Sequence, residues 1–271
     1  MKFKAFFLFF NGIIAAFLLA ILFMPMVGGG FVSPWDRSLW MSLWPIAAVL
    51  ATTLIILDIY YFFNRKLFRL LEREDWPALS AYLETRFMRR GRYPAQLTRL
   101  FVNTCLVMSD SRSVLDLENR LMLVRPALVE RNALVFGVAH ILAKDFGGAL
   151  RFFAARDRGD LAKRPRQWIA WYHGFSMLLE KQFLNAAEKF RFLAREARDP
   201  VVAALAAWFL ADNLSRATSF LEEAAAARER VRGVLKARKD WERELARTEN
   251  EIYTAIVRRY INDAGNWIYQ T

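Results

Sequence analysis

Residues 40–63 read WMSLWPIAAVLATTLIILDIYYFF, and this stretch decides how the rest of the chain is organised. Asp58 is its one charged side chain, and basic residues follow it directly. About twenty apolar residues, rising about 1.5 Å each, cross a hydrocarbon core roughly 30 Å thick. Residues 40–63 therefore predict a membrane-spanning helix.

An earlier apolar run, at about residues 5–27, is either a signal peptide or a second membrane span. The apolar region of a signal peptide is usually about 7–15 residues long and ends in small residues at a cleavage site. This run is longer, and the sequence MPMV at residues 24–27 makes a poor cleavage site. We expect a retained helix, joined to the next by a short glycine-rich turn. Residues 1–66 would then form an anchor with two transmembrane helices.

Positive charge beside the two runs predicts the orientation, because cytoplasmic flanks retain lysine and arginine. Lys2 and Lys4 precede the first run, and Arg37 alone lies between the two. A basic cluster follows the second run: Arg65, Lys66, Arg69 and Arg73. We therefore expect both termini on the cytoplasmic side of a bacterial inner membrane, with the basic cluster against anionic lipid headgroups.

From residue 67 to about 217 the apolar positions recur three and four apart, which predicts consecutive helices. Two segments share a pattern at the same internal spacing, 37 positions apart: Gly137, Ala149 and Phe153 match Gly174, Ala186 and Phe190. Extended backward, the pattern predicts Ala78 and Leu115 at the alanine position. The repeat indicates helical hairpins stacked side by side.

This pattern resembles the tetratricopeptide repeat (TPR) family, in which a glycine of the first helix is followed by an alanine and then an aromatic residue of the second. The spacing of 37 residues exceeds the 34 usual for that family. The resemblance implies an α-solenoid that binds other proteins along its inner face. A generic solenoid of helical hairpins is the alternative.

Residues 218–271 are rich in helix formers, and Gly233 is the one glycine between residues 219 and 263. We expect one long helix there, ending in an apolar tail at residues 267–269. The predicted fold class is therefore all-α: an N-terminal transmembrane hairpin, a TPR-like α-solenoid and a long C-terminal helix.

Catalytic chemistry has no support in the sequence. Cys105 is the single cysteine and His140 and His173 are the two histidines, which is too few for a structural zinc site. The glycines at residues 28–30 lack the following Gly-Lys-Ser/Thr of a phosphate-binding loop. We predict no catalytic, cofactor-binding or metal-binding residue, and a protein that is not an enzyme.

The TPR resemblance implies a groove on the inner face of the solenoid. Its predicted residues are Trp168, Trp171, Phe175, Leu178, Leu205 and Phe209. An apolar strip of this size needs a cover. Either the C-terminal helix folds back over it, or an amphipathic helix of a partner occupies it.

These features lead to the hypothesis of a non-enzymatic scaffold that organises a protein complex at a bacterial inner membrane. Its partners would be other membrane or membrane-associated proteins, further copies of itself and anionic lipids. Nucleic acid is not expected, despite a net charge of +12, because aromatic residues do not alternate with the basic ones. The alternatives are a small accessory subunit of a transporter or channel that uses Asp58 and Asn11, or a component of an envelope motility or secretion machine with its repeats in the periplasm.

Overall fold

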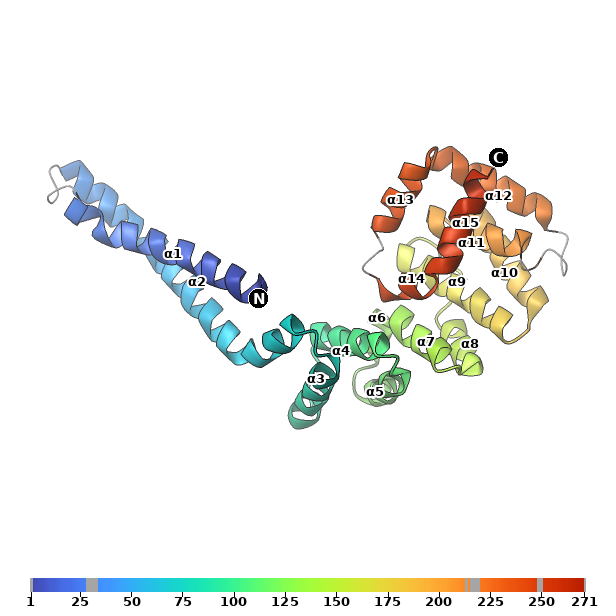
Figure 1. Ribbon diagram of the computed structural model, residues 1–271, viewed down its shortest axis with the longest axis horizontal. Coiled ribbons are helices and arrows are strands. Elements are labelled where there is room, and N and C mark those ends of the chain that lie inside the picture. Colours follow the sequence, from blue (N-terminus) through green and yellow to red (C-terminus); the bar gives the residue numbers. More distant parts are fainter. Residues whose placement is uncertain (1, 28–33, 213, 215–219, 248–250, 271) are drawn as a thin grey trace. The chain divides into compact units, whose positions relative to one another are not determined.

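A computed structural model describes residues 2–27, 34–212, 214, 220–247 and 251–270. Within these ranges the chain forms helices and no strand, so the all-α prediction is confirmed (Figure 1). The helices divide into two compact units, Met1–Arg92 and Tyr93–Thr271. The predicted turn at residues 28–33 lies outside the described residues.

The first unit opens with α1 (Lys2–Val27) and α2 (Pro34–Glu72), which lie side by side in Figure 1. Three of their contacts show the relative direction of the two helices: Trp40 Nε1 donates to the Ile21 carbonyl (3.0 Å), Asn11 Nδ2 donates to Asp58 Oδ1 (2.7 Å), and the rings of Phe7 and Tyr61 stack (4.3 Å between centroids). As the residue number rises in α2, that of its partner in α1 falls. The two helices therefore form an antiparallel pair.

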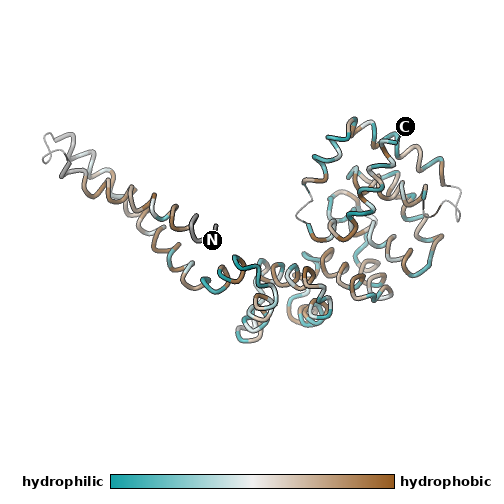
Figure 2. The backbone as a smooth tube through the Cα atoms, viewed as in Figure 1, coloured by the Kyte–Doolittle hydropathy of each residue, from teal (hydrophilic) through white to brown (hydrophobic). Residues whose placement is uncertain are grey.

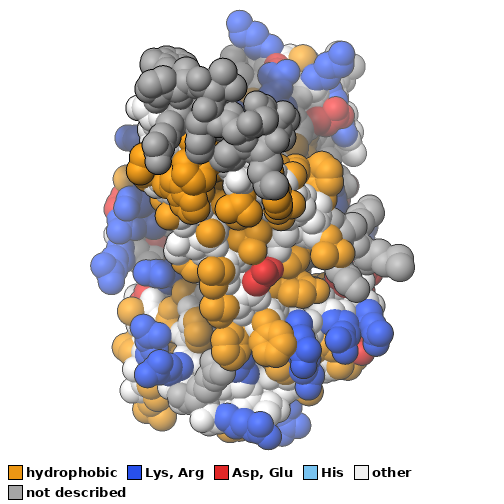
Figure 3. All heavy atoms as spheres, turned by 90° about the vertical axis from the view of Figure 1, so that its left-hand side faces the viewer, with side chains coloured by type: hydrophobic (Ala, Val, Ile, Leu, Met, Phe, Trp, Pro, Cys, Tyr) orange, Lys and Arg blue, Asp and Glu red, His pale blue; other side chains and the backbone are white. Residues whose placement is uncertain are grey.

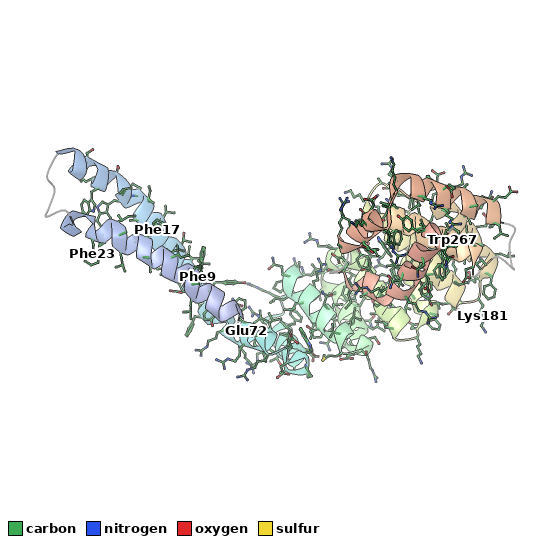
Figure 4. All side chains as sticks on the ribbon, turned by 45° about the horizontal axis from the view of Figure 1, so that its top comes forward. Phe9, Phe17, Phe23, Glu72, Lys181 and Trp267 are labelled. Carbon is green, nitrogen blue, oxygen red and sulfur yellow. The ribbon has the colours of Figure 1, made fainter. Side chains whose placement is uncertain are left out.

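One helix of the described residues is long and apolar enough to cross a membrane, Trp40–Glu72 within α2. Only 6% of its most apolar window is buried by the protein, so it is not a core helix. The apolar part of α1, Phe7–Phe23, is shorter. Phe9, Phe17 and Phe23 of α1 are exposed (Figure 4), and hydrophobic residues follow both helices in Figure 2. Hydrophobic side chains also gather on the face of the protein that Figure 3 shows.

The first unit ends with α3 (Trp76–Arg90), which packs on α2. The carboxylate of Asp75 caps it by accepting a hydrogen bond from Ala78 N (3.1 Å). Gly91, at a φ of +56°, ends it in the left-handed conformation that glycine adopts without strain. Leu79 and Leu83 face inward and are fully buried.

The second unit begins with eight helices in chain order: α4 (Ala95–Val107), α5 (Ser111–Val124), α6 (Pro126–Arg131), α7 (Ala133–Leu142), α8 (Phe146–Ala154), α9 (Arg164–Leu179), α10 (Phe183–Glu196) and α11 (Pro200–Ala211). Proline stands in the first turn of α6, α9 and α11, where its missing N–H costs no hydrogen bond. Neighbours such as α7 and α8, or α9 and α10, pack on each other as hairpins.

The predicted long C-terminal helix is wrong, because that region forms four helices: α12 (Leu221–Val234), α13 (Arg238–Ala246), α14 (Ile252–Ile256) and α15 (Arg258–Tyr269). α13, α14 and α15 bury Trp241, Tyr253 and Ile268, which a straight continuation of α12 would carry away from the unit. At the break after α12 the hydroxyl of Tyr269 donates to the Leu235 carbonyl (2.7 Å). Asp240 accepts from Ala237 N (3.1 Å), so the broken backbone finds new partners.

The same kind of turn occurs at four places in the described residues: between α2 and α3, α4 and α5, α7 and α8, and α9 and α10. A residue with positive φ comes first: Glu74 (54°), Ser109 (60°), Lys144 (60°) and Lys181 (60°, labelled in Figure 4). The next residue donates its N–H to the carbonyl five positions back: Asp75 to Leu70, Asp110 to Cys105, Asp145 to His140 and Gln182 to Met177. The turns are therefore equivalent, at spacings of 35, 35 and 37 residues.

In each turn the residue that donates this N–H is also the N-cap of the following helix. The residue four positions after that N-cap is fully buried: Leu79, Val114, Ala149 and Ala186. The sequence pattern identified Ala149 and Ala186 but placed Ala78 and Leu115 in the two earlier hairpins, each wrong by one residue. The turn sets the register, because it fixes which face of the second helix meets the first.

The contact between the two helices of a hairpin also recurs 37 positions apart. Gly137 on α7 faces the ring of Phe153, and Gly174 on α9 faces the ring of Phe190. Each ring then stacks on an aromatic residue of the following helix: Phe153 on Tyr172 (5.4 Å between centroids) and Phe190 on Phe209 (5.2 Å). The same side chains thus join α7 through α11 in one continuous core.

Candidate functional site

The predicted interaction groove lies in the core of the second unit. Trp168, Trp171 and Leu205 are fully buried, Phe175 and Phe209 nearly so, and Leu178 is half-buried. Five of the six predicted groove residues are therefore closed to a partner.

Helices α14 and α15 provide the cover. Tyr253 packs on Trp168 with 5.4 Å between ring centroids, and its carbonyl accepts a hydrogen bond from the hydroxyl of Tyr172. The ring of Tyr260 lies 5.3 Å from that of Phe209. The chain's own C-terminal segment, which folds back as one of the two expected occupants, fills the strip.

The two histidines each hold helices together. His140 Nδ1 lies 2.8 Å from Asp145 Oδ2, and its Nε2 lies 3.1 Å from Glu118 Oε2. Burial lowers the pKa of His140, and the hydrogen bonds to the two carboxylates raise it by more. His140 therefore links α5 and α7 to the start of α8.

His173 shares a carboxylate with a lysine. Asp157 Oδ2 accepts from His173 Nδ1 (2.7 Å) and from Lys189. Burial raises the pKa of Asp157, but these two hydrogen bonds lower it by more, to about 2. No group of three potential ligands is placed for a metal ion in the described parts of the chain, and Cys105 is buried. These polar groups therefore support the fold.

The predicted membrane-surface basic cluster, in contrast, is exposed. Arg65, Lys66, Arg69 and Arg73 all reach solvent at the C-terminal end of α2. The guanidinium of Arg65 lies over the ring of Phe62, 4.8 Å from its centroid. The ammonium of Lys66 lies over Tyr82 of α3, 5.2 Å from that centroid.

Lys66 lines a cleft between α2 and α3 that encloses about 610 Å³. Three side chains come from α2 and six from α3: Phe63, Lys66, Leu70, Ala78, Ala81, Tyr82, Thr85, Arg86 and Arg89. The predicted basic cluster included Lys66 but did not join it to Arg86 and Arg89 of α3. Their signal was the spacing of Arg86 and Arg89, three apart and hence on one helical face.

The cleft is cationic. Arg86 Nη1 lies 3.3 Å from Asn64 Oδ1 and 3.3 Å from the Tyr82 hydroxyl, which hold its guanidinium in place. Among the described residues, no carboxylate forms an ion pair with Lys66, Arg86 or Arg89. This cleft, the α2–α3 cleft, is the candidate functional site, and its chemistry suits an anion.

Comparison with known proteins finds similarity to Treponema proteins. A protein of Treponema pallidum (strain Nichols), described as "Uncharacterized protein", is 29% identical over 218 residues, which cover 79% of this chain and 67% of that protein. No solved structure matches. A family model described as "Uncharacterised Treponema protein" matches residues 113–270, which include α6 to α15. This match spans more than half of the chain, so the chain belongs to that Treponema family.

Proposed function

We propose that this protein is a membrane-anchored, non-enzymatic scaffold that organises a protein complex at a bacterial inner membrane. One observation carries the proposal: four equivalent helical turns and a long, exposed apolar helix occur in one chain. Such turns suit a solenoid that presents protein-binding surface, and such a helix suits attachment to a bilayer.

The repeated turn and the Gly137–Phe153 and Gly174–Phe190 contacts support a TPR-like solenoid. In that family, too, a small residue of the first helix accommodates an aromatic residue of the second. Because α14 and α15 occupy the predicted groove, we propose that partners bind elsewhere on the repeats. The end of α5 offers an apolar surface, where Met122, Leu123 and Val124 are exposed, Leu123 at 88%.

Photo-crosslinking in cells tests the scaffold proposal. A photoreactive amino acid at Leu123 should give a discrete crosslinked complex, since this side chain is free to meet a partner. The same amino acid at Phe175 should give none, because that position is buried and packs on Tyr260 of α15. If intact protein recovered from membranes carries no crosslinked partner from Leu123 or from other exposed positions of α4 to α10, the scaffold proposal fails.

We also propose that α1 and α2 both insert, with the repeats and both termini in the cytoplasm, on the basis of the charge asymmetry across the hairpin. The protein should stay in the membrane fraction after alkaline carbonate extraction. With Cys105 replaced by alanine, a cysteine at Ser33 should react with an impermeant reagent added to spheroplasts, and one at Lys239 should not. The reverse labelling would place the repeats in the periplasm.

The alternative of a transporter subunit depends on Asp58. Its carboxylate accepts a hydrogen bond from Asn11, which gives Asp58 a structural partner within the α1–α2 pair. We therefore favour a role in holding the two helices together. Asp58→Asn should lower the stability of the pair and leave any co-purifying transport activity intact. Loss of transport with unchanged assembly would favour the alternative.

A further inference from the structure

We infer that the α2–α3 cleft binds the phosphate-bearing headgroup of an anionic phospholipid. This inference rests on the membrane insertion of α2 in the proposed function and adds a specific ligand to it. The cleft and all its lining residues lie within the first unit.

The cleft opens where the apolar run ends. Phe63 is the last residue of that run, lines the cleft and is 73% exposed. Lys66 follows about one helical turn, or roughly 5 Å, further along α2. When residues 40–63 cross the hydrocarbon core, the cleft therefore lies at the depth of the headgroups.

The charge of the cleft is unbalanced within the protein. Lys66, Arg86 and Arg89 line it, and no described carboxylate forms an ion pair with any of them. Positively charged groups that converge without an internal counter-ion favour an external anion. A phosphate suits these donors, because a guanidinium presents two N–H groups in the geometry of two phosphate oxygens.

The donors are also positioned before a ligand arrives. Asn64 and Tyr82 each lie 3.3 Å from Arg86 Nη1, and Lys66 rests over the Tyr82 ring. Fixing these long side chains in advance reduces the entropy lost when a ligand binds. Such support distinguishes the cleft from an ordinary exposed run of arginines.

The rest of the lining fits the remainder of a lipid. Leu70, Ala78 and Ala81 give an apolar wall, and Phe63 continues it toward the apolar run. A volume of about 610 Å³ lies in the usual range for small-ligand sites, about 300–1,000 Å³. A phosphate would meet the cations while the glycerol and the first acyl carbons lie along the apolar wall.

Two matched triple variants of the full-length protein test this site. In the cleft variant, Lys66, Arg86 and Arg89 become alanine. In the flank variant, Arg65, Arg69 and Arg73 become alanine, which removes the same amount of charge at the C-terminal end of α2 but none of the cleft lining. Binding of phosphatidylglycerol and phosphatidylcholine is measured in detergent by native mass spectrometry, where the surface potential of a bilayer is absent.

We expect the wild-type protein to bind phosphatidylglycerol at least about tenfold more tightly than phosphatidylcholine, since charge-assisted hydrogen bonds act on the anion. The cleft variant should lose about tenfold or more in affinity, and the flank variant less than about threefold. Should the cleft variant misfold by circular dichroism, the single variant Arg89→Ala, at an exposed position, should still lose at least about threefold.

Equal losses in the two triple variants would mean diffuse attraction and would overturn the inference. So would equal binding of the two lipids. Glycerol 1-phosphate and inorganic phosphate serve as soluble competitors, and displacement of the lipid at equal concentration would show a soluble ligand instead. Carbonate extraction is scored separately, so a protein that stays in the membrane but lacks lipid preference refutes this inference and leaves the proposed anchor standing.

Discussion

Gly137 and Gly174 occupy the same place in two hairpins but differ in the space around them. A Cβ at Gly137 would lie 2.6 and 2.8 Å from Cε1 and Cε2 of the fully buried Phe153, which is stacked on Tyr172 and cannot move aside. A Cβ at Gly174 would lie 3.1 Å from Cε1 of Phe190. The first contact is far inside van der Waals distance, and the second needs a shift of only a few tenths of an ångström.

The two substitutions to alanine should therefore change the free energy of unfolding by different amounts. Alanine in place of a helical glycine contributes about 1 kcal/mol of stability. Forcing a methyl group into a packed core costs about 1–3 kcal/mol. For Gly137→Ala we take the upper end of that cost and expect a net loss of about 2 kcal/mol, or about 4–8 °C in Tm. For Gly174→Ala the two effects nearly cancel, within about 1 kcal/mol.

Thermal unfolding of the full-length variants in detergent, followed by circular dichroism at 222 nm as is usual for helices, measures the difference. Gly233→Ala is the control, because nothing lies within 4 Å of its added Cβ and the variant should gain up to about 1 kcal/mol. If Gly137→Ala is as stable as Gly174→Ala, the packing of Phe153 against that glycine is not what the structure describes.

Three further predictions concern the second unit. The pKa of His140 is raised in the folded protein above its ordinary value of 6.5, so protonation of His140 stabilises the fold below about pH 6.5, and this stabilisation is lost as the pH rises through the folded pKa. His140→Gln should therefore make the urea midpoint of unfolding depend less on pH between about pH 6 and about pH 8. The pKa of Asp157 is about 2 in the folded protein, against its ordinary value of 3.8, so the ionised carboxylate stabilises the fold above pH 3.8 and this stabilisation is lost as the pH falls toward 2. Asp157→Asn should lower the free energy of unfolding by about 2 kcal/mol at neutral pH, and denaturant titrations of the variant should lack this part of the loss of stability in acid. Trp171→Ala should cost about 3–5 kcal/mol in the same assay because the side chain is fully buried, whereas Leu123→Ala should stay within about 0.5 kcal/mol.

Local spacing was enough to predict that the chain is helical and to pair the positions around Gly137 and Gly174. The turns were harder to recognise, because Glu74, Ser109, Lys144 and Lys181 hold positive φ without being glycine. In the sequence, these turns are marked only by an aspartate that follows Glu74, Ser109 and Lys144. A register drawn from apolar residues alone therefore slipped by one position in the two earlier hairpins.

The C-terminal region could not be predicted from propensity, since contacts far apart in the sequence break it. Gly265 of α15 lies so close to Trp241 of α13 that a Cβ would stand 2.5 Å from the indole nitrogen. That close approach requires the chain to reverse between the two helices. Likewise, charge counting found Lys66, but Arg86 and Arg89 joined it only when α3 folded against α2.

The four equivalent turns also bear on how such a chain changes length. Because the backbone has the same conformation at Lys144 and at Lys181, a duplicated segment of residues 145–181 would begin and end in matching geometry. The new copy would present Phe153 to its neighbour at the spacing that Phe190 already uses. Unequal recombination at these points would add or remove whole hairpins without disturbing the packing of the others, and so would change the length of the array while keeping the same joints.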